Sequence, residues 1–308
     1  MGALIGIRLG CAGMAFLQMQ LNWSCQVHDR FRSFWLTHEP NQLIVWDGQQ
    51  ELASLDASGQ IRWQKQLDSQ TQKIALSANG RVLVQARGDG RITSVDCTTW
   101  QPVAEWHLEH LPKCLGLDAF GQHIVVATDK RWNYLFKVTG EEIARCQSAR
   151  RWHHLCLLET QKQWIGVAEQ GCIQLLNDHC QVLWQDISTY ILGNLAITVD
   201  GHLWVATFGH GIRKINLNSG QASQINTPHP VALVASNCVN SHLWMVSEAA
   251  LHETANLSLL HPDGRVLATI TLANRPQCIQ VAPSGDSLFL GWASGHIENW
   301  VLSAIQTK

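Results

Sequence analysis

The stretch Leu52-Ala53-Ser54-Leu55-Asp56-Ala57-Ser58-Gly59 is the clearest copy of a unit that recurs along this chain of 308 residues. It places two apolar residues three positions apart and follows them with an aspartate and a glycine turn. Further copies begin at Ile92, Trp132, Ile173, Ile212, Leu257 and Ile297. By subtraction, the spacings from Leu52 onward are 40, 40, 41, 39, 45 and 40 residues. This period is typical of a four-stranded propeller blade, so seven copies predict seven blades.

Turn signals separate short apolar runs within the repeats. Asn79-Gly80 precedes the apolar run 82–84, and Asp200-Gly201 precedes the run 203–206. Such pairs supply the positive φ angles that tight hairpins require. The inner strands are almost continuously apolar, which indicates sheets covered on both faces by neighbouring blades. We therefore expect an all-β fold of four-stranded antiparallel blades.

The seventh repeat ends near Leu302 without a fourth strand. One period before the fourth strand of repeat one lie residues 20–27, and three of them match their counterparts: Gln20, Trp23 and Gln26 against Gln60, Trp63 and Gln66. Apolar and polar residues alternate from Leu17 to Val27, as in an outer strand with one solvent-exposed face. Because a ring of sheets has to hide its edge strands, we expect this strand to complete blade seven. Residues 1–16 would then be an N-terminal extension, and residues 17–308 a single propeller domain.

Residues 52–63, which end in Gln60-Ile61-Arg62-Trp63, resemble one repeat of the quinoprotein-type (PQQ-like) propeller family, which overlaps in shape with WD-repeat proteins. Echoes recur at residues 181–184 and 295–300. Trp46-Asp47 is the sole WD dipeptide and ends a second strand, whereas WD repeats carry theirs at the end of the third. Resemblance to the quinoprotein enzymes would imply pyrroloquinoline quinone and calcium. Since the chain has no vicinal cysteine pair, we expect no cofactor.

Composition restricts the classes of partner. The chain is 46% hydrophobic and 15% charged, and its formal net charge is −2, so it exerts no global attraction on nucleic acid or anionic lipid. Ten scattered cysteines without a CxxC pair indicate reduced thiols in a cytoplasmic protein. The apolar residues 1–16 leave export as an alternative, although Arg8 interrupts the run. No later segment is apolar for the length of a membrane span, and we expect no membrane insertion.

Loops at one end of the ring are the expected binding site. In propellers of the families that the chain resembles, these loops join the fourth strand to the next blade and the second strand to the third. Basic and aromatic residues gather on them around repeats two to four, and the candidate partner-binding residues are Arg87, Lys130, Arg131, Arg150, Arg151, Trp152, His153 and His210. Arg and Trp are enriched at interface hot spots. The alternative is that these are solvated loop charges balanced by Asp89, Glu109, Asp129 and Glu169. On the first interpretation, truncating Arg151 or Trp152 should weaken binding without lowering thermal stability.

Few patterns point to catalysis or metal binding. His153-His154 and Cys156 offer zinc-ligand chemistry, but adjacent residues of an extended segment point to opposite faces, and no fourth ligand has recognisable spacing. We expect no metal site. The GxSxG, HExxH, P-loop and GxGxxG signatures are absent. The sequence therefore favours a non-catalytic, monomeric platform that binds another protein or its acidic segment. The alternatives are a small-molecule hydrolase or lyase at the channel mouth and an envelope-assembly propeller.

Overall fold

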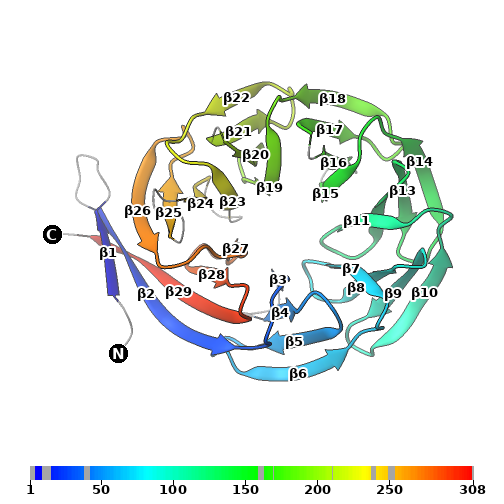
Figure 1. The fold of residues 1–308 in the computed structure, drawn as a ribbon, viewed down its shortest axis with the longest axis horizontal. Coiled ribbons are helices and arrows are strands. Elements are labelled where there is room, and N and C mark those ends of the chain that lie inside the picture. Colours follow the sequence, from blue (N-terminus) through cyan, green and yellow to red (C-terminus); the bar gives the residue numbers. More distant parts are fainter. Residues whose placement is uncertain are drawn as a thin grey trace.

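The computed structural model describes residues 4–8, 15–37, 42–158, 163–168, 170–209, 211–236, 241–248 and 254–306. In that part of the chain there are strands and no helices, and the strands form seven antiparallel sheets around a central channel (Figure 1). The prediction of a seven-bladed β-propeller is confirmed. The same residues hold no helix long and apolar enough to cross a membrane.

The first six blades follow one another along the chain, and each runs from the channel outward. Blade one contains β3 (Ser33–Leu36), β4 (Leu43–Trp46), β5 (Glu51–Leu55) and β6 (Ile61–Gln66). Blade two contains β7 (Thr71–Leu76), β8 (Val82–Arg87), β9 (Arg91–Asp96) and β10 (Gln101–His107). Blade three contains β11 (Pro112–Leu117), β12 (His123–Thr128), β13 (Trp132–Lys137) and β14 (Glu142–Gln147).

The next three blades repeat this order. Blade four contains β15 (Trp152–Leu158), β16 (Gln163–Ala168), β17 (Cys172–Leu176) and β18 (Val182–Ile187). Blade five contains β19 (Ile191–Ile197), β20 (His202–Phe208), β21 (Gly211–Asn216) and β22 (Ala222–Ile225). Blade six contains β23 (Val231–Ser236), β24 (Leu243–Glu248), β25 (Ala255–Leu260) and β26 (Val266–Leu272).

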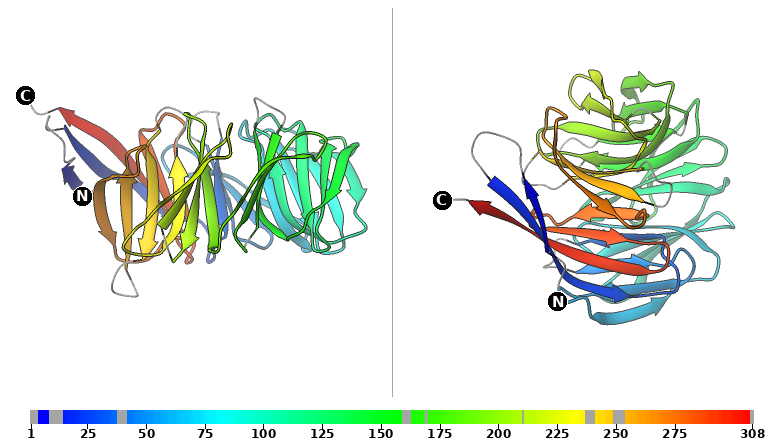
Figure 2. Two further views of the ribbon diagram at one scale, coloured as in Figure 1. Left: turned by 90° about the horizontal axis from the view of Figure 1, so that it is seen from above. Right: turned by 60° about the vertical axis from the view of Figure 1, so that its left-hand side comes forward.

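Blade seven joins the two ends of the chain. Its strands are β27 (Cys278–Val281), β28 (Ser287–Gly291), β29 (His296–Gln306) and the N-terminal β2 (Ala15–Gln26). β2 runs antiparallel to β29, and both strands extend past the ring (Figure 2). The prediction that the N-terminal strand completes the last blade is confirmed. Within the expected extension, β1 (Leu4–Arg8) pairs with β2 as a fifth strand of this sheet.

The hydrophobic core lies between neighbouring blades. Each buried cluster takes residues from two adjacent sheets; for example, Val84 and Ile92 of blade two pack with Ile124 and Val126 of blade three. The same arrangement holds at the other blade interfaces around the ring. Both faces of each sheet are therefore covered, which accounts for the nearly continuous apolar character of the inner strands.

Tryptophans of several outer strands connect their blade to a turn of the next blade. Trp23 of β2 donates a hydrogen bond from Nε1 to the Ala57 carbonyl of blade one at 2.7 Å. Trp63 of β6 contacts Trp100 of blade two edge to face, with ring centroids 5.0 Å apart. Trp23 and Trp63 thus serve the same role one period apart. This equivalence explains why the closing strand resembles the fourth strand of blade one.

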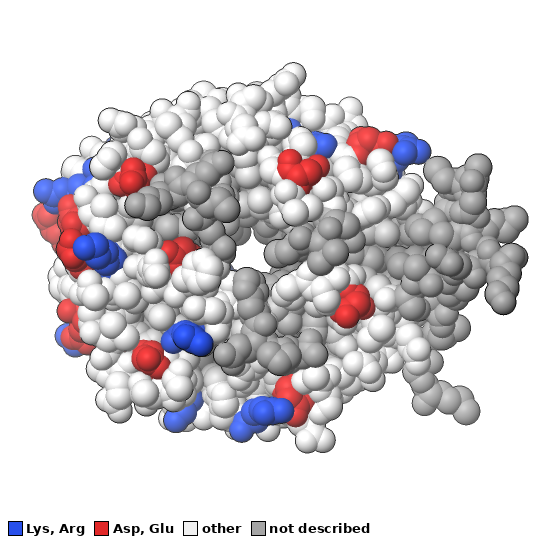
Figure 3. Space-filling view, turned by 180° about the vertical axis from the view of Figure 1, so that it is seen from behind, with Lys and Arg blue, Asp and Glu red and all other residues white. Residues whose placement is uncertain are grey.

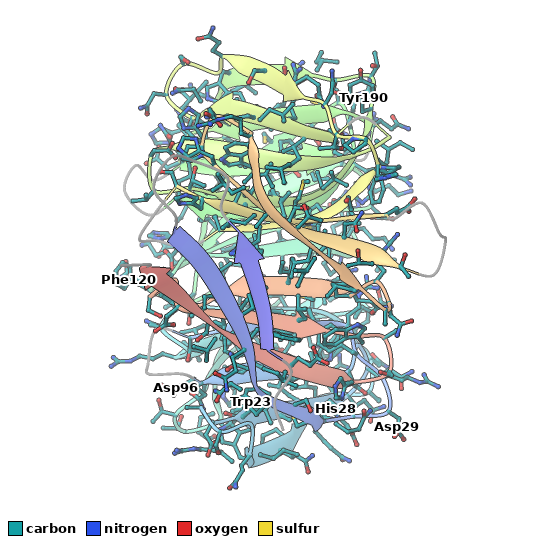
Figure 4. All side chains as sticks on the ribbon, turned by 90° about the vertical axis from the view of Figure 1, so that its left-hand side faces the viewer. Trp23, His28, Asp29, Asp96, Phe120 and Tyr190 are labelled. Carbon is teal, nitrogen blue, oxygen red and sulfur yellow. The ribbon has the colours of Figure 1, made fainter. Side chains whose placement is uncertain are left out.

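The two ends of the ring carry different loops. Figure 4 shows Asp96 and Phe120, from turns inside blades, at one end, and Asp29 and Tyr190, from connections between blades, at the other. We call the second end the upper face. It carries the connections from each outer strand to the next inner strand and from each second strand to the third.

Candidate functional site

A pocket of about 900 Å³ opens at the channel mouth on the upper face, beside the inner strands of blades two to four. We call it the basic pocket, because its described lining contains one carboxylate, Asp129, against six cationic side chains: Arg32, Lys73, Lys113, Arg131, Arg150 and Arg151. Trp152, His153 and His154 also line it. In the view of Figure 3, from behind, the described Lys and Arg are instead scattered among Asp and Glu around the channel. The positive charge therefore concentrates at one mouth of the channel.

A recurring β-bulge presents the innermost of these residues. The inner strands of blades two, three and four each shift register near their first residues, so that the strand register skips Gln72, Lys113 and His153. All three side chains are exposed. Bulges re-aim side chains and are common beside functional sites. Here they present one residue per blade at the mouth of the channel.

The same repeat position carries charged residues on one side of the channel. In blade one it is occupied by Arg32, which directly precedes β3 and whose N–H donates to the Trp46 carbonyl. In blades five to seven, the equivalent residues are Gly193, Ala232 and Gln277, which carry no charge. At this position, cationic side chains therefore occur in blades one and three, an imidazole in blade four, and no charged residue in blades five to seven.

The next position along each inner strand adds a second, deeper layer. In blades two to four, this position holds Lys73, Cys114 and His154. Burial lowers the pKa of Lys73, and the positive charges of Arg32 and Lys113 lower it further. Burial also lowers the pKa of His154 to about 4, with smaller contributions from His153 and Lys73. The deeper layer thus combines a half-buried lysine with a thiol and with an imidazole whose protonated form is disfavoured by burial.

Arg131 has a strained backbone at the pocket rim. Its φ is +67°, in the left-handed region that side chains other than glycine, asparagine and aspartate rarely adopt. At the equivalent turn position, blades two and four have Gly90 and Gly171, with φ of +94° and +80°. The guanidinium donates to the Ala149 carbonyl at 3.1 Å. Strained residues that the fold does not require cluster at functional sites, so this arginine is a candidate for a binding role.

The structure brings together some of the residues expected from the sequence and leaves others apart. Arg131, Arg150, Arg151, Trp152 and His153 line the basic pocket. Arg87 does not: its guanidinium contacts Asp68 at 2.9 Å and Asp89 at 3.5 Å, in agreement with the alternative of balanced loop charges. Lys130 is exposed on the β12–β13 turn outside the lining. His210 lies outside the described residues.

Trp152 is placed differently from what its loop position suggests. Its side chain is only 5% exposed and belongs to the core between blades three and four. The indole lies 5.4 Å from the Trp164 ring, between centroids, and directly over Gly166, where a Cβ would come within 0.9 Å of the ring. Trp152 forms a wall of the pocket but does not project from it. The expectation that truncating it would spare stability is therefore not supported.

Sequence reasoning missed Arg32, Lys73, Lys113 and His154 as members of one site. The signal was present, because Arg32, Gln72, Lys113 and His153 follow the 40- or 41-residue spacing of the repeat. Applying that period to the inner strands would have placed them around one channel mouth. No protein-family model matches this chain, and no curated protein is detectably similar to it. Among the described residues, no group of three His, Cys, Asp or Glu side chains could hold a metal ion.

We expect the thermal unfolding midpoint to fall as the pH decreases from about 6.5 to about 4. His154 gains a proton near 6.5 in the unfolded chain but only near 4 in the folded protein, so the unfolded state binds more protons across this window. Scanning calorimetry in phosphate-free buffer would measure the midpoint against pH. The His154→Gln variant should give a flatter curve, and His179→Gln, at an exposed turn, should follow the wild type. If the unfolding midpoint falls equally steeply with decreasing pH in all three proteins, burial of a neutral His154 is not the cause of the pH dependence.

Proposed function

We propose that this protein is a non-catalytic interaction platform that receives an acidic segment of a partner protein in the basic pocket. The main observation in support is the charge of the described pocket lining, where six Lys and Arg side chains stand against one carboxylate in a chain whose net charge is −2. A cleft lined by one sign of charge focuses its field and raises the local concentration of oppositely charged ligands. A volume of about 900 Å³ admits several side chains of a partner.

The strained Arg131 supports a binding role. A glycine would meet the backbone requirement of this turn without strain, as in the neighbouring blades. Left-handed backbone at a side chain such as arginine costs on the order of 1–3 kcal/mol. The proposed binding role explains why the chain has a strained arginine here, since a glycine would not place a cation at the pocket rim.

Apolar side chains beside the pocket extend the binding surface. Arg150 and Trp152 also line an adjoining small pocket that includes Ile187. The side chain of Ile187 is 63% exposed, and Ile191, at the start of the next inner strand, is 55% exposed. Ile191 lies opposite Phe208, which is 40% exposed. A partner segment with an apolar residue next to its acidic residues would match this surface.

Family membership is a further part of the proposal. The motif at residues 52–63 supports placing the chain among the quinoprotein-like propellers rather than the WD repeats. A propeller of this kind holds its loops on a rigid ring, and loops on a rigid scaffold are where binding residues are usually found.

The function is tested by titrating a fluorescent peptide of alternating Glu and Ile residues. Wild-type protein should bind it with an affinity that falls steeply as salt is added. The Arg150→Ala/Arg151→Ala variant should bind about tenfold or more weakly, and so should Arg131→Gly, because each loses charge-assisted contacts. Thermal stability should be preserved in both variants and raised by up to about 1 kcal/mol in Arg131→Gly, where the strain is removed.

The matched control is Arg62→Ala/Arg145→Ala, which removes two exposed arginines from the outer strands β6 and β14. Its net charge changes as in the Arg150→Ala/Arg151→Ala variant, but the pocket is intact. If both double variants bind the peptide equally weakly, the loss of affinity comes from the change in net charge, and the proposed site is contradicted. Failure of the wild type to bind would also overturn it.

A further inference from the structure

We propose that Arg32, Lys73 and Lys113 form a phosphoryl-binding site in the depth of the basic pocket, and that it selects a phosphorylated side chain in the partner segment. This inference rests on the proposed platform function and specifies its ligand. The three residues come from different blades, and the packing of these consecutive blades brings them together.

The geometry places the three cations around one space. Lys73 lies on β7 and Lys113 on the neighbouring inner strand β11, while Arg32 directly precedes β3 on the other side of β7. All three line the same pocket. Lys73 lies in the electrostatic field of both Arg32 and Lys113. An anion seated among them would contact side chains from three consecutive blades.

No carboxylate among the described residues forms an ion pair that balances their charge. Within the described residues, no ion pair joins Arg32, Lys73 or Lys113 to a carboxylate. The one carboxylate in the described pocket lining, Asp129, accepts the backbone N–H of Leu111 at 3.2 Å. Lys73 is half-buried, so water screens the repulsion poorly. A bound anion would replace this repulsion by attraction.

The amount of charge favours a phosphoryl group over a single carboxylate. A phosphorylated side chain carries a charge of about −1.5 to −2 and three strong acceptor oxygens, whereas a carboxylate carries one charge and two oxygens. Lysine and arginine are the usual partners of phosphate, and clusters of basic side chains recognise phosphorylated segments. Three converging cations match three oxygens. The outer residues Arg131, Arg150 and Arg151 remain available for acidic residues that flank the phosphorylated one.

The experiment compares two labelled peptides that differ at one residue, phosphoserine or glutamate, within the same Glu- and Ile-containing sequence. Wild-type protein should bind the phosphoserine peptide about tenfold or more tightly. Lys73→Met and Lys113→Met should each remove most of this preference while they retain binding of the glutamate peptide through the outer arginines. Lys137→Met is the matched control, because this lysine pairs with Glu141 on an exposed turn outside the pocket, and the preference should persist.

Thermal unfolding supplies a second measurement that does not require a peptide. Inorganic phosphate should raise the unfolding midpoint of the wild type and of Lys137→Met, because a ligand that binds the folded state stabilises it. It should leave Lys73→Met unchanged. In phosphate-free buffer, Lys73→Met should be at least as stable as the wild type, since the variant lacks a desolvated, repelled charge.

The outcomes separate this inference from the platform function. Equal affinity of the wild type for both peptides would overturn the phosphoryl site and leave the platform intact. Stabilisation by phosphate without binding of either peptide would support the phosphoryl site, assign it to a free phosphorylated small molecule and overturn the partner segment. Absence of any response to phosphate or peptide would overturn both.

Discussion

Replacing Trp152 by alanine is expected to lower the free energy of unfolding by about 3–5 kcal/mol, the usual cost of removing a buried large aromatic side chain. The indole is 5% exposed, packs against Trp164 and lies on Gly166. Removing it would leave a cavity between blades three and four that the rigid sheets cannot close. Urea unfolding of the wild type and the variant would measure the loss.

Two further variants test whether the loss of indole packing causes the lower stability of Trp152→Ala. Trp152→Phe retains part of the packing and should lose less stability than the alanine variant. Gly166→Ala should also destabilise the protein, because the added methyl group would occupy the space of the indole. A loss below about 1 kcal/mol in Trp152→Ala would show that the indole is not part of the core and would restore it as a peripheral binding residue.

Deleting residues 1–26 is expected to abolish cooperative unfolding. This deletion removes β2, exposes the full edge of β29 and uncovers the cluster in which Met19 packs with Leu288 and Trp300. The lost contacts represent a large share of the roughly 5–15 kcal/mol by which domains are stable. An open sheet edge also invites pairing between chains. Calorimetry and light scattering should therefore show no sharp transition and progressive aggregation.

The matched control is deletion of residues 1–14, which removes β1 and retains β2. We expect the ring to close and a cooperative transition to persist. Addition of a synthetic peptide of residues 15–27 to the longer deletion should restore part of the transition by pairing with β29. A sharp wild-type transition in the 1–26 deletion would contradict the closure as a source of stability.

The position of the basic pocket follows from the repeat symmetry of the propeller. Residues one period apart in the chain occupy equivalent places around the ring, so a single repeat position contributes a circle of side chains to the channel mouth. Arg32, Lys113 and His153 share such a position, whereas Gly193 and Ala232 occupy it across the channel. Variation at one repeat position therefore contributes to a polarised surface without altering the scaffold.

Comparison of the outer and inner strands shows where sequence reasoning succeeded. The closing strand was predictable because Trp23 and Trp63 stand one period apart and make the same kind of contact with the next blade. Arg150 and Arg151 were predictable as loop residues because the turns around them are marked locally. Lys73 and Lys113 were not identified, since each is an isolated lysine in an apolar strand and gains a role only beside its neighbours.

The sequence by itself determined the number of blades, their strand order and the closure of the ring. These features depend on local periodicity and turn chemistry, which repeat along the chain and do not require knowledge of distant contacts. Tertiary structure alone decided which cations converge, that Trp152 is a core residue and that Arg87 is neutralised by Asp68 and Asp89. The physical reason is that burial and electrostatic fields arise from residues on different strands and blades, and these meet only when the strands pair and the blades pack.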